Sequence, residues 1–129
     1  MKRLVFVLGL VAALVGGGYA VSSAQETGIE VQHAHGTIAK GSTVCVGPMS
    51  RIDGHAMLMH GSTNGAALTW QLLALNVGNP PVVISDATGT AVQFRDETTV
   101  ADQFDACVLK TSGQAQDFDL TLIAEAIAP

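Results

Sequence analysis

The sequence lacks the motifs that mark most enzymes and nucleotide-binding proteins. It has no Gly-x-Ser-x-Gly elbow for a serine nucleophile, no His-Glu-x-x-His pair for zinc and no glycine-rich loop for phosphate. Aromatic residues make up only 5% of the chain, which leaves little material for stacking against sugars or bases. We therefore expect a protein without catalytic activity.

Cationic side chains are also scarce, since 6 Lys and Arg stand against 11 Asp and Glu. Lys2 and Arg3 lie in an N-terminal segment that we expect to be removed, which leaves a net charge of −7 with neutral histidines. A surface of this charge repels the phosphates of nucleic acids and of anionic lipids. We expect no nucleic-acid partner.

The first 24 residues predict a secretory signal peptide. Lys2 and Arg3 give it a basic start, residues 4–15 form an almost unbroken apolar run, and small residues follow, so that cleavage fits after Ala20 or Ala24. The run is shorter than the roughly 20 residues that a bilayer-spanning helix needs. We expect no stable membrane span after cleavage, with an uncleaved anchor as the alternative. The predicted location is secreted, either extracellular or periplasmic.

The end of this segment, Ala-Leu-Val-Gly-Gly-Gly-Tyr-Ala at residues 13–20, is similar to the leaders of the camelysin and TasA class of biofilm-fibre proteins. The resemblance covers the leader alone. It implies a sandwich-like fold that assembles by strand exchange, with an edge segment at residues 28–35 pairing with the sheet of a neighbour.

The chain has only two cysteines, Cys45 and Cys107, and no Cys-x-x-Cys motif. In an exported protein two cysteines in apolar, strand-like surroundings are most simply a structural disulfide. Such a bond closes a loop of about 63 residues and stabilises the fold by roughly 4 kcal/mol on the chain-entropy model.

Apolar residues in the rest of the chain alternate with polar ones instead of recurring every three or four positions. Leu68, Trp70 and Leu72 share one face of an extended segment, although the alanines and leucines of residues 66–75 also allow a helix. Short runs of this kind, separated by turn residues, predict seven to eight strands. We expect an all-β protein, a small immunoglobulin-like or jelly-roll-like β-sandwich over residues 42–129, preceded by an edge segment or mobile tail at residues 25–41.

Two connections between these strands predict β-hairpins. Asn64-Gly65 stands between two extended apolar runs, and this dipeptide favours a type I′ turn because both residues tolerate positive φ. Residues 104–122 read as two strands with a polar loop at residues 111–114. Cys107 lies in the first of these two strands.

Five sulfur and imidazole side chains within twelve residues form a candidate soft-metal site: Met49, His55, Met57, Met59 and His60. Thioether and imidazole ligands together suit copper in an oxidising compartment. The stretch His-Ala-Met-Leu-Met at residues 55–59 also resembles the His-x-Met element of periplasmic copper chaperones of the PCu(A)C type, which implies copper binding. The alternative is that the methionines belong to the core.

Two weaker candidates use histidines and acidic residues. His33 and His35 are two positions apart and are able to chelate a metal together. Six acidic residues crowd into 24 positions and offer oxygen ligands for calcium, or a solvated face: Asp96, Glu97, Asp102, Asp105, Asp117 and Asp119.

The sequence thus predicts a small secreted β-sandwich with one disulfide, acting as a non-catalytic extracellular or cell-surface binding or structural module without a cofactor. The alternative is a periplasmic or extracellular copper-binding protein that uses the histidine and methionine cluster. Self-association through an edge strand is the expected kind of partner contact, while a protein or surface ligand is not specified by any motif.

Overall fold

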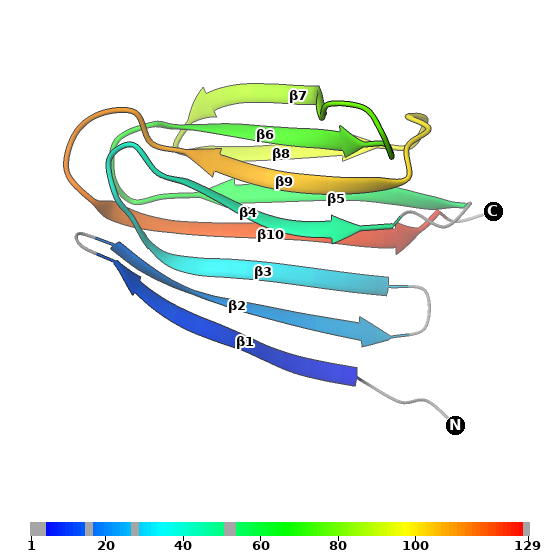
Figure 1. The fold of residues 1–129 in the computed structure, drawn as a ribbon, viewed down its shortest axis with the longest axis horizontal. Coiled ribbons are helices and arrows are strands. Elements are labelled where there is room, and N and C mark those ends of the chain that lie inside the picture. The colour runs from blue at the N-terminus through cyan, green and yellow to red at the C-terminus, as the bar shows by residue number, and fades with distance from the viewer. Residues whose placement is uncertain (1–4, 15–16, 27–28, 51–53, 128–129) are drawn as a thin grey trace.

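A computed structural model describes residues 5–14, 17–26, 29–50 and 54–127. Its elements are all strands: β1 Val5–Leu14, β2 Gly17–Glu26, β3 Ile29–Ile38, β4 Thr43–Met49, β5 His55–Ser62, β6 Leu68–Leu75, β7 Val82–Gly89, β8 Ala91–Asp96, β9 Gln103–Leu109 and β10 Gln116–Ala126 (Figure 1). Within these ranges the structure contains no helical segment with the length and apolarity that crossing a bilayer requires.

The strands form two antiparallel sheets that pack face to face. One sheet has the order β1-β2-β3-β10-β5-β8 and the other has the order β4-β9-β6-β7. From β3 onward the chain passes to the other sheet at every connection except the one between β6 and β7. The strands β3 to β10 therefore have the arrangement of a jelly roll, with four strands in each layer. This confirms the predicted all-β sandwich and selects the jelly-roll form over the immunoglobulin form.

The connection at Asn64-Gly65 is an arch between the two sheets, so the predicted hairpin is wrong. No described residue other than glycine has a positive φ, and Asn64 therefore does not form a type I′ turn. The loop is held instead by β10, since Thr63 Oγ1 donates to the Asp117 carbonyl oxygen at 2.6 Å and the Gln116 amide donates to the Ala66 carbonyl oxygen at 2.6 Å. The two flanking strands have apolar faces, which are buried by packing against each other.

Residues 104–122 likewise form an arch, because β9 and β10 belong to different sheets (Figure 1). The predicted hairpin is wrong here for the same reason. The alternation of apolar and polar residues was assigned correctly, since Phe118, Leu120 and Leu122 are at most 2% exposed. Their buried faces meet those of Phe104 and the other strands in one core between the sheets.

Trp70 lies at the centre of this core with no exposed surface. Its indole Nε1 donates to the Gly89 carbonyl oxygen at 2.9 Å, so the buried polar atom has a partner. Gly61 on β5 leaves room for the ring, because a Cβ at this position would overlap the indole. Residues 68–75 alternate strictly between buried and half-buried positions, which confirms a strand and not a helix.

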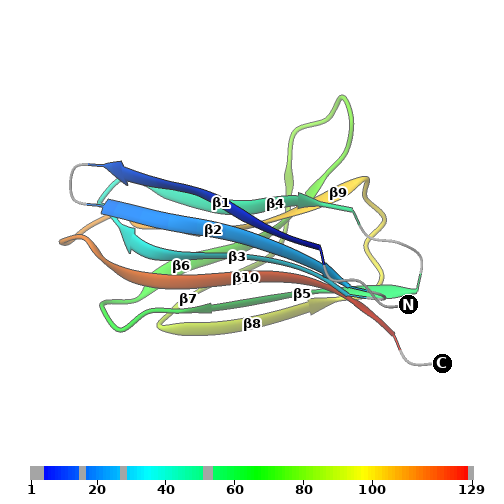
Figure 2. The same cartoon turned by 90° about the horizontal axis from the view of Figure 1, so that it is seen from below.

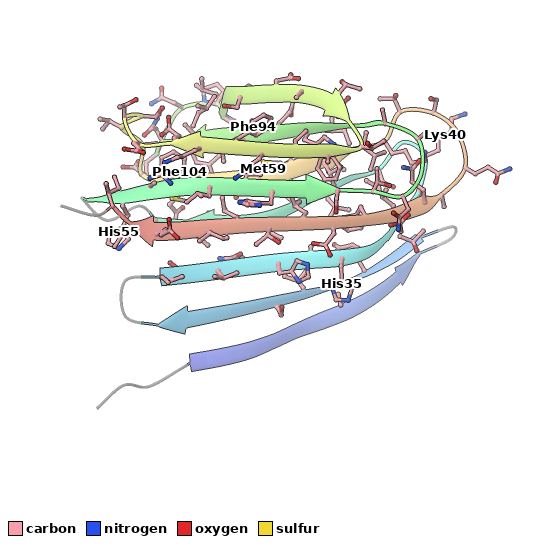
Figure 3. The ribbon with its side chains drawn as sticks, turned by 180° about the vertical axis from the view of Figure 1, so that it is seen from behind. His35, Lys40, His55, Met59, Phe94 and Phe104 are labelled. Carbon is pink, nitrogen blue, oxygen red and sulfur yellow. A yellow bond between two sulfur atoms is a disulfide. The ribbon has the colours of Figure 1, made fainter. Side chains whose placement is uncertain are left out.

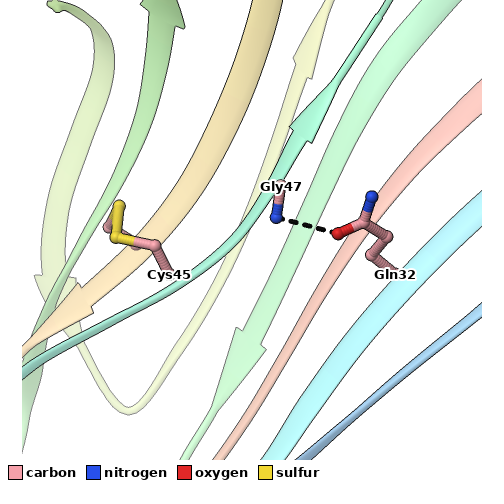
Figure 4. Close-up of a disulfide and its surroundings, with 4 residues drawn as sticks. Gln32, Cys45 and Gly47 are labelled. Carbon is pink, nitrogen blue, oxygen red and sulfur yellow. Dashed lines mark hydrogen bonds between the residues drawn. A yellow bond between two sulfur atoms is a disulfide. The ribbon is translucent and has the colours of Figure 1, made fainter. Parts of the chain in front are cut away.

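Cys45 and Cys107 form the predicted disulfide, with an S–S distance of 2.04 Å. The two residues are register partners on β4 and β9, so the bond joins neighbouring strands of one sheet and does not bridge the two layers. Close by, the Gly47 amide of β4 donates to Gln32 Oε1 of β3 at 2.9 Å (Figure 4). This hydrogen bond does link the two sheets, at the side where β3 and β4 lie.

The N-terminal segment extends the larger sheet beyond β3. Figure 2 shows β1 and β2 lying beside β3, with β10, β5 and β8 following on the other side. Parts of the predicted signal peptide, including Lys2 and Arg3, lie outside the described residues. In the predicted edge segment or tail at residues 25–41, Ile29–Ile38 forms β3, which pairs with β2 on one side and with β10 on the other.

Candidate binding site along strand β3

The predicted sulfur and imidazole side chains are divided between the core and the surface. Met49, Met57 and Met59 are at most 1% exposed and belong to the core. Figure 3 labels Met59 among them. His60 is exposed, and His55 is half-buried at the start of β5. The five side chains therefore share no surface. Copper binding remains a prediction that rests on the sequence pattern alone.

The candidate oxygen and imidazole ligands are also dispersed. In the part of the chain that the structure describes, no three His, Cys, Asp or Glu side chains are grouped so as to hold a metal ion. Asp102 accepts a hydrogen bond from the Val77 amide at 2.8 Å, and Asp96 accepts one from the Thr99 amide at 3.1 Å. These two carboxylates accept hydrogen bonds from loop amides and so stabilise the loops, whereas Asp119 lies on the outer face of the larger sheet.

That outer face is polar around β3, β10 and β5. The rings of His33 and His35 stack at a centroid distance of 5.1 Å, with His35 labelled in Figure 3. His33 Nε2 lies 2.7 Å from Asp119 Oδ1. A shallow hollow of about 220 Å³ next to them is lined by His60, Gln93 and Asp119, among others. The pair between His33 and Asp119 is solvated, and such pairs contribute at most about 1 kcal/mol.

Asp105 on β9 is a carboxylate in an unusual environment. Desolvation by burial raises the pKa of this group above its ordinary value of 3.8. Its Oδ1 has no hydrogen-bond partner among the described residues. The side chain lies against Gly47 of β4, where an added Cβ would overlap that oxygen. It belongs to the β4–β9 pair of the smaller sheet.

The best-defined binding geometry is the edge of β3 on which β2 lies. The two strands pair along nearly their whole length, from Gly18 opposite Thr37 to Glu26 opposite Ile29. Near one end of the contact is Gly36, with a φ of +145°, a conformation that residues with a side chain rarely adopt. A Cβ at position 36 would overlap the Gly18 carbonyl oxygen. Glycine therefore permits the close approach of the neighbouring backbone.

An aromatic side chain of β2 covers this glycine. Tyr19 is the register partner of Gly36 on one side, and Phe118 of β10 is its partner on the other. Because the glycine has no side chain, the two rings meet across it at a centroid distance of 6.3 Å and an angle of 59°. Tyr19 and Val21, two positions further on, both pack against the core. A hollow of about 240 Å³ next to Tyr19 continues toward Ile38 and Val44.

The strands β4, β7 and β8 carry features that discourage pairing with another chain. β4 contains Pro48 and a shift in register, and Pro81 directly precedes β7, which also has a register shift against β6. β8 is only 6 residues long and includes Arg95 and Asp96. β3 has 10 residues and neither proline nor lysine. Protected edges of natural sheets are short, charged, irregular or proline-containing, whereas β3 is long, has no proline and carries Glu30 as its one acidic residue.

The sequence contains a signal for this site that the sequence analysis did not use. Gly36 interrupts an extended run whose neighbours Ala34 and Ile38 are buried, and a glycine inside a strand often marks a close approach of another backbone. The pairing of Gly36 with Tyr19 was not foreseen, because it depends on the register between β2 and β3.

No protein-family model matches this sequence, and no curated protein matches it either. Among solved structures, the chain is similar to a mitogen derived from Yersinia pseudotuberculosis, with a TM-score of 0.52, 17% identity, and coverage of 76% of this chain and 86% of that one. It is also similar to a structure of disulfide-linked pili of Bacillus endospore appendages, with a TM-score of 0.43, 11% identity and coverage of 78% and 89%. A family 11 carbohydrate-binding module from Clostridium thermocellum matches with a TM-score of 0.37, 7% identity and coverage of 98% and 84%. At these identities the likeness concerns the fold alone.

Proposed function

We propose that this chain is an exported, non-catalytic binding or structural module that takes up an extended segment of a partner chain along β3. The observation that carries the proposal is the seating of β2 on that edge, from Gly18 opposite Thr37 to Glu26 opposite Ile29. The sequence assigns most of β2 to a signal peptide. The contact therefore describes how the edge holds a strand whose first part, at least residues 17–20, the exported protein no longer carries.

Both cleavage positions have the same consequence for the contact between Tyr19 and Gly36. Cleavage after Ala20 or after Ala24 removes Tyr19 and leaves Gly36 without its cover. The backbone groups of β3 that paired with residues 18–20 then lack their partners, and strand addition satisfies them. The rest of the sandwich keeps both sheets and the disulfide, so β3 belongs to a folded, disulfide-bonded domain after cleavage.

Hydrogen exchange on protein recovered from an exporting host tests this proposal. Mass spectrometry first defines the N-terminus, and amide exchange is then followed in residues 29–38 with and without a synthetic peptide of residues 17–26. We expect loss of residues 1–20 or 1–24, fast exchange of the β3 amides that do not pair with β10, and slower exchange of the same amides with the peptide. A recovered protein that retains residues 17–26, or a peptide that leaves β3 exchange unchanged, would overturn the proposal.

Gly36→Ala provides the matching variant, with Gly41→Ala as its control. Both glycines have a positive φ, so both substitutions strain the backbone. A Cβ at position 36 meets the added strand, whereas a Cβ at position 41 has no neighbour within 4 Å. Protection by the peptide should be lost in Gly36→Ala and kept in Gly41→Ala. Equal protection in the two variants would show that the peptide does not bind beside Gly36.

A further inference from the structure

We infer that the β3 edge selects an extended polypeptide segment that runs antiparallel to β3 and places Tyr or Phe opposite Gly36 and an apolar residue opposite Ala34. This inference rests on the proposed function and specifies its partner. It applies to the chain cleaved after Ala24, because cleavage after Ala20 leaves Val21 on the protein itself. In the structure these two positions are filled by Tyr19 and Val21, and both side chains pack against the core.

Gly36 leaves a gap on the inner face of β3 that an aromatic ring of the incoming segment can fill. The inner face of β3 is covered by side chains at Ala34 and Ile38 but has none at position 36 between them. An incoming ring is large enough to lie over the glycine and reach Phe118 on the next strand, as Tyr19 does at 6.3 Å. A methyl or branched aliphatic group at this position is shorter and leaves the glycine open. Aromatic residues cover strand glycines in this way in other sheets.

The position opposite Ala34 adds a second requirement for the incoming segment. Val21 is the register partner of Ala34, which is completely buried. Since side chains two positions apart share one face, the incoming segment presents an aromatic and an apolar residue to the core together. A polar residue opposite Ala34 would be half-buried against the apolar core, as Val21 is, and would lose part of its hydration, which opposes binding.

A second copy of the exported chain does not meet this requirement. Its aromatic residues after position 24 are Trp70, Phe94, Phe104 and Phe118, and all four pack in or against their own core. None is available to cover Gly36 of a neighbour while the sandwich remains folded. Two exported chains also carry a net charge of −7 each and repel one another. The partner is therefore a different polypeptide.

Peptide binding to the protein recovered from an exporting host tests this selection. The probes are a fluorescently labelled peptide of residues 17–26 and its Tyr19→Phe, Tyr19→Ala and Val21→Ser variants, measured by fluorescence anisotropy. We expect Tyr19→Phe to bind within about threefold of the parent peptide. Tyr19→Ala and Val21→Ser should bind roughly tenfold more weakly, because each loses a partly buried apolar group that packs against the core.

The outcomes separate the inference from the function on which it rests. Equal affinity for the parent and Tyr19→Ala peptides would overturn the aromatic requirement and leave strand addition in place. Absence of binding by every peptide would overturn both. The recovered protein could also form reversible dimers that are lost in Gly36→Ala and kept in the control Gly41→Ala. This result would show that a second copy occupies the edge and would overturn the inference.

Discussion

Gly61 lies on the inner face of β5, directly below the indole ring of Trp70 from the opposite sheet. A Cβ at this position would lie 2.5 Å from Cζ3 and 2.9 Å from Cδ2 of Trp70, and would overlap a third ring atom. The ring is completely buried and is held by the hydrogen bond from its Nε1 to Gly89, so it has little freedom to move. Gly61→Ala therefore forces either the ring or the sheets to shift.

The expected destabilisation follows from two opposing effects. Overpacking a filled core by one methyl group costs about 1–3 kcal/mol. Gly61 has no positive φ, so an alanine also stabilises the fold by about 0.4–1 kcal/mol through the smaller entropy of the unfolded chain. The net loss is about 1–2 kcal/mol, which for a domain of this size lowers the melting temperature by roughly 5–15 °C.

Thermal unfolding by circular dichroism measures this change, and Gly89→Ala is the matched control. A Cβ at Gly89 has only ordinary contacts at 3.7 Å or more, so this variant should melt at the same temperature or slightly higher. In a Trp70→Phe background the smaller ring should remove about 1 kcal/mol of the Gly61→Ala penalty. Equal melting temperatures for Gly61→Ala and Gly89→Ala would refute the face-to-face packing of β5 and β6.

Three further changes test other parts of the structure. Replacing Cys45 and Cys107 by serine should lower the free energy of unfolding by up to roughly 4 kcal/mol in urea, and an unchanged value would contradict a stabilising disulfide. Asp105→Asn should stabilise the protein more at pH 7 than at about pH 4. Because the pKa of Asp105 is raised in the folded protein, the wild-type protein keeps its full stability below pH 3.8 and loses part of it as the pH rises through the pKa of the folded state. Urea titrations at both pH values measure this difference. Thr63→Val removes the hydroxyl that donates to β10 and should cost about 1–3 kcal/mol by chemical denaturation. Thr69→Val removes only a solvent-exposed hydroxyl pair with Thr88 and should change stability by less than about 0.5 kcal/mol.

Local patterns in the sequence were sufficient for the strands and the disulfide. Alternation such as Leu68, Trp70, Leu72 requires only that one face of the segment is buried, so it can be recognised without knowing which strand lies beside it. The pairing of Cys45 with Cys107 follows because an exported chain with two cysteines offers one intramolecular bond.

The sequence did not decide between a hairpin and an arch. Asn64-Gly65 is a strong turn signal, but whether the next strand returns to the same sheet depends on which apolar faces pack together, and this involves residues far apart in the chain. The same limit applies to the methionines, because Met57 and Met59 are suitable as ligands and as core residues, and only their burial distinguishes the two roles.

The β3 edge depended most on the tertiary structure. The sequence contains both Gly36 and Tyr19, yet their meeting over Phe118 requires β2 to pair with β3 in one register and β3 to pair with β10 in another. A shift of either register by one residue would turn the opposing side chains to the other face of the sheet. The sequence by itself left residues 25–41 as either an edge segment or a mobile tail, and the packing of three strands determined that β3 is extended and what its edge can hold.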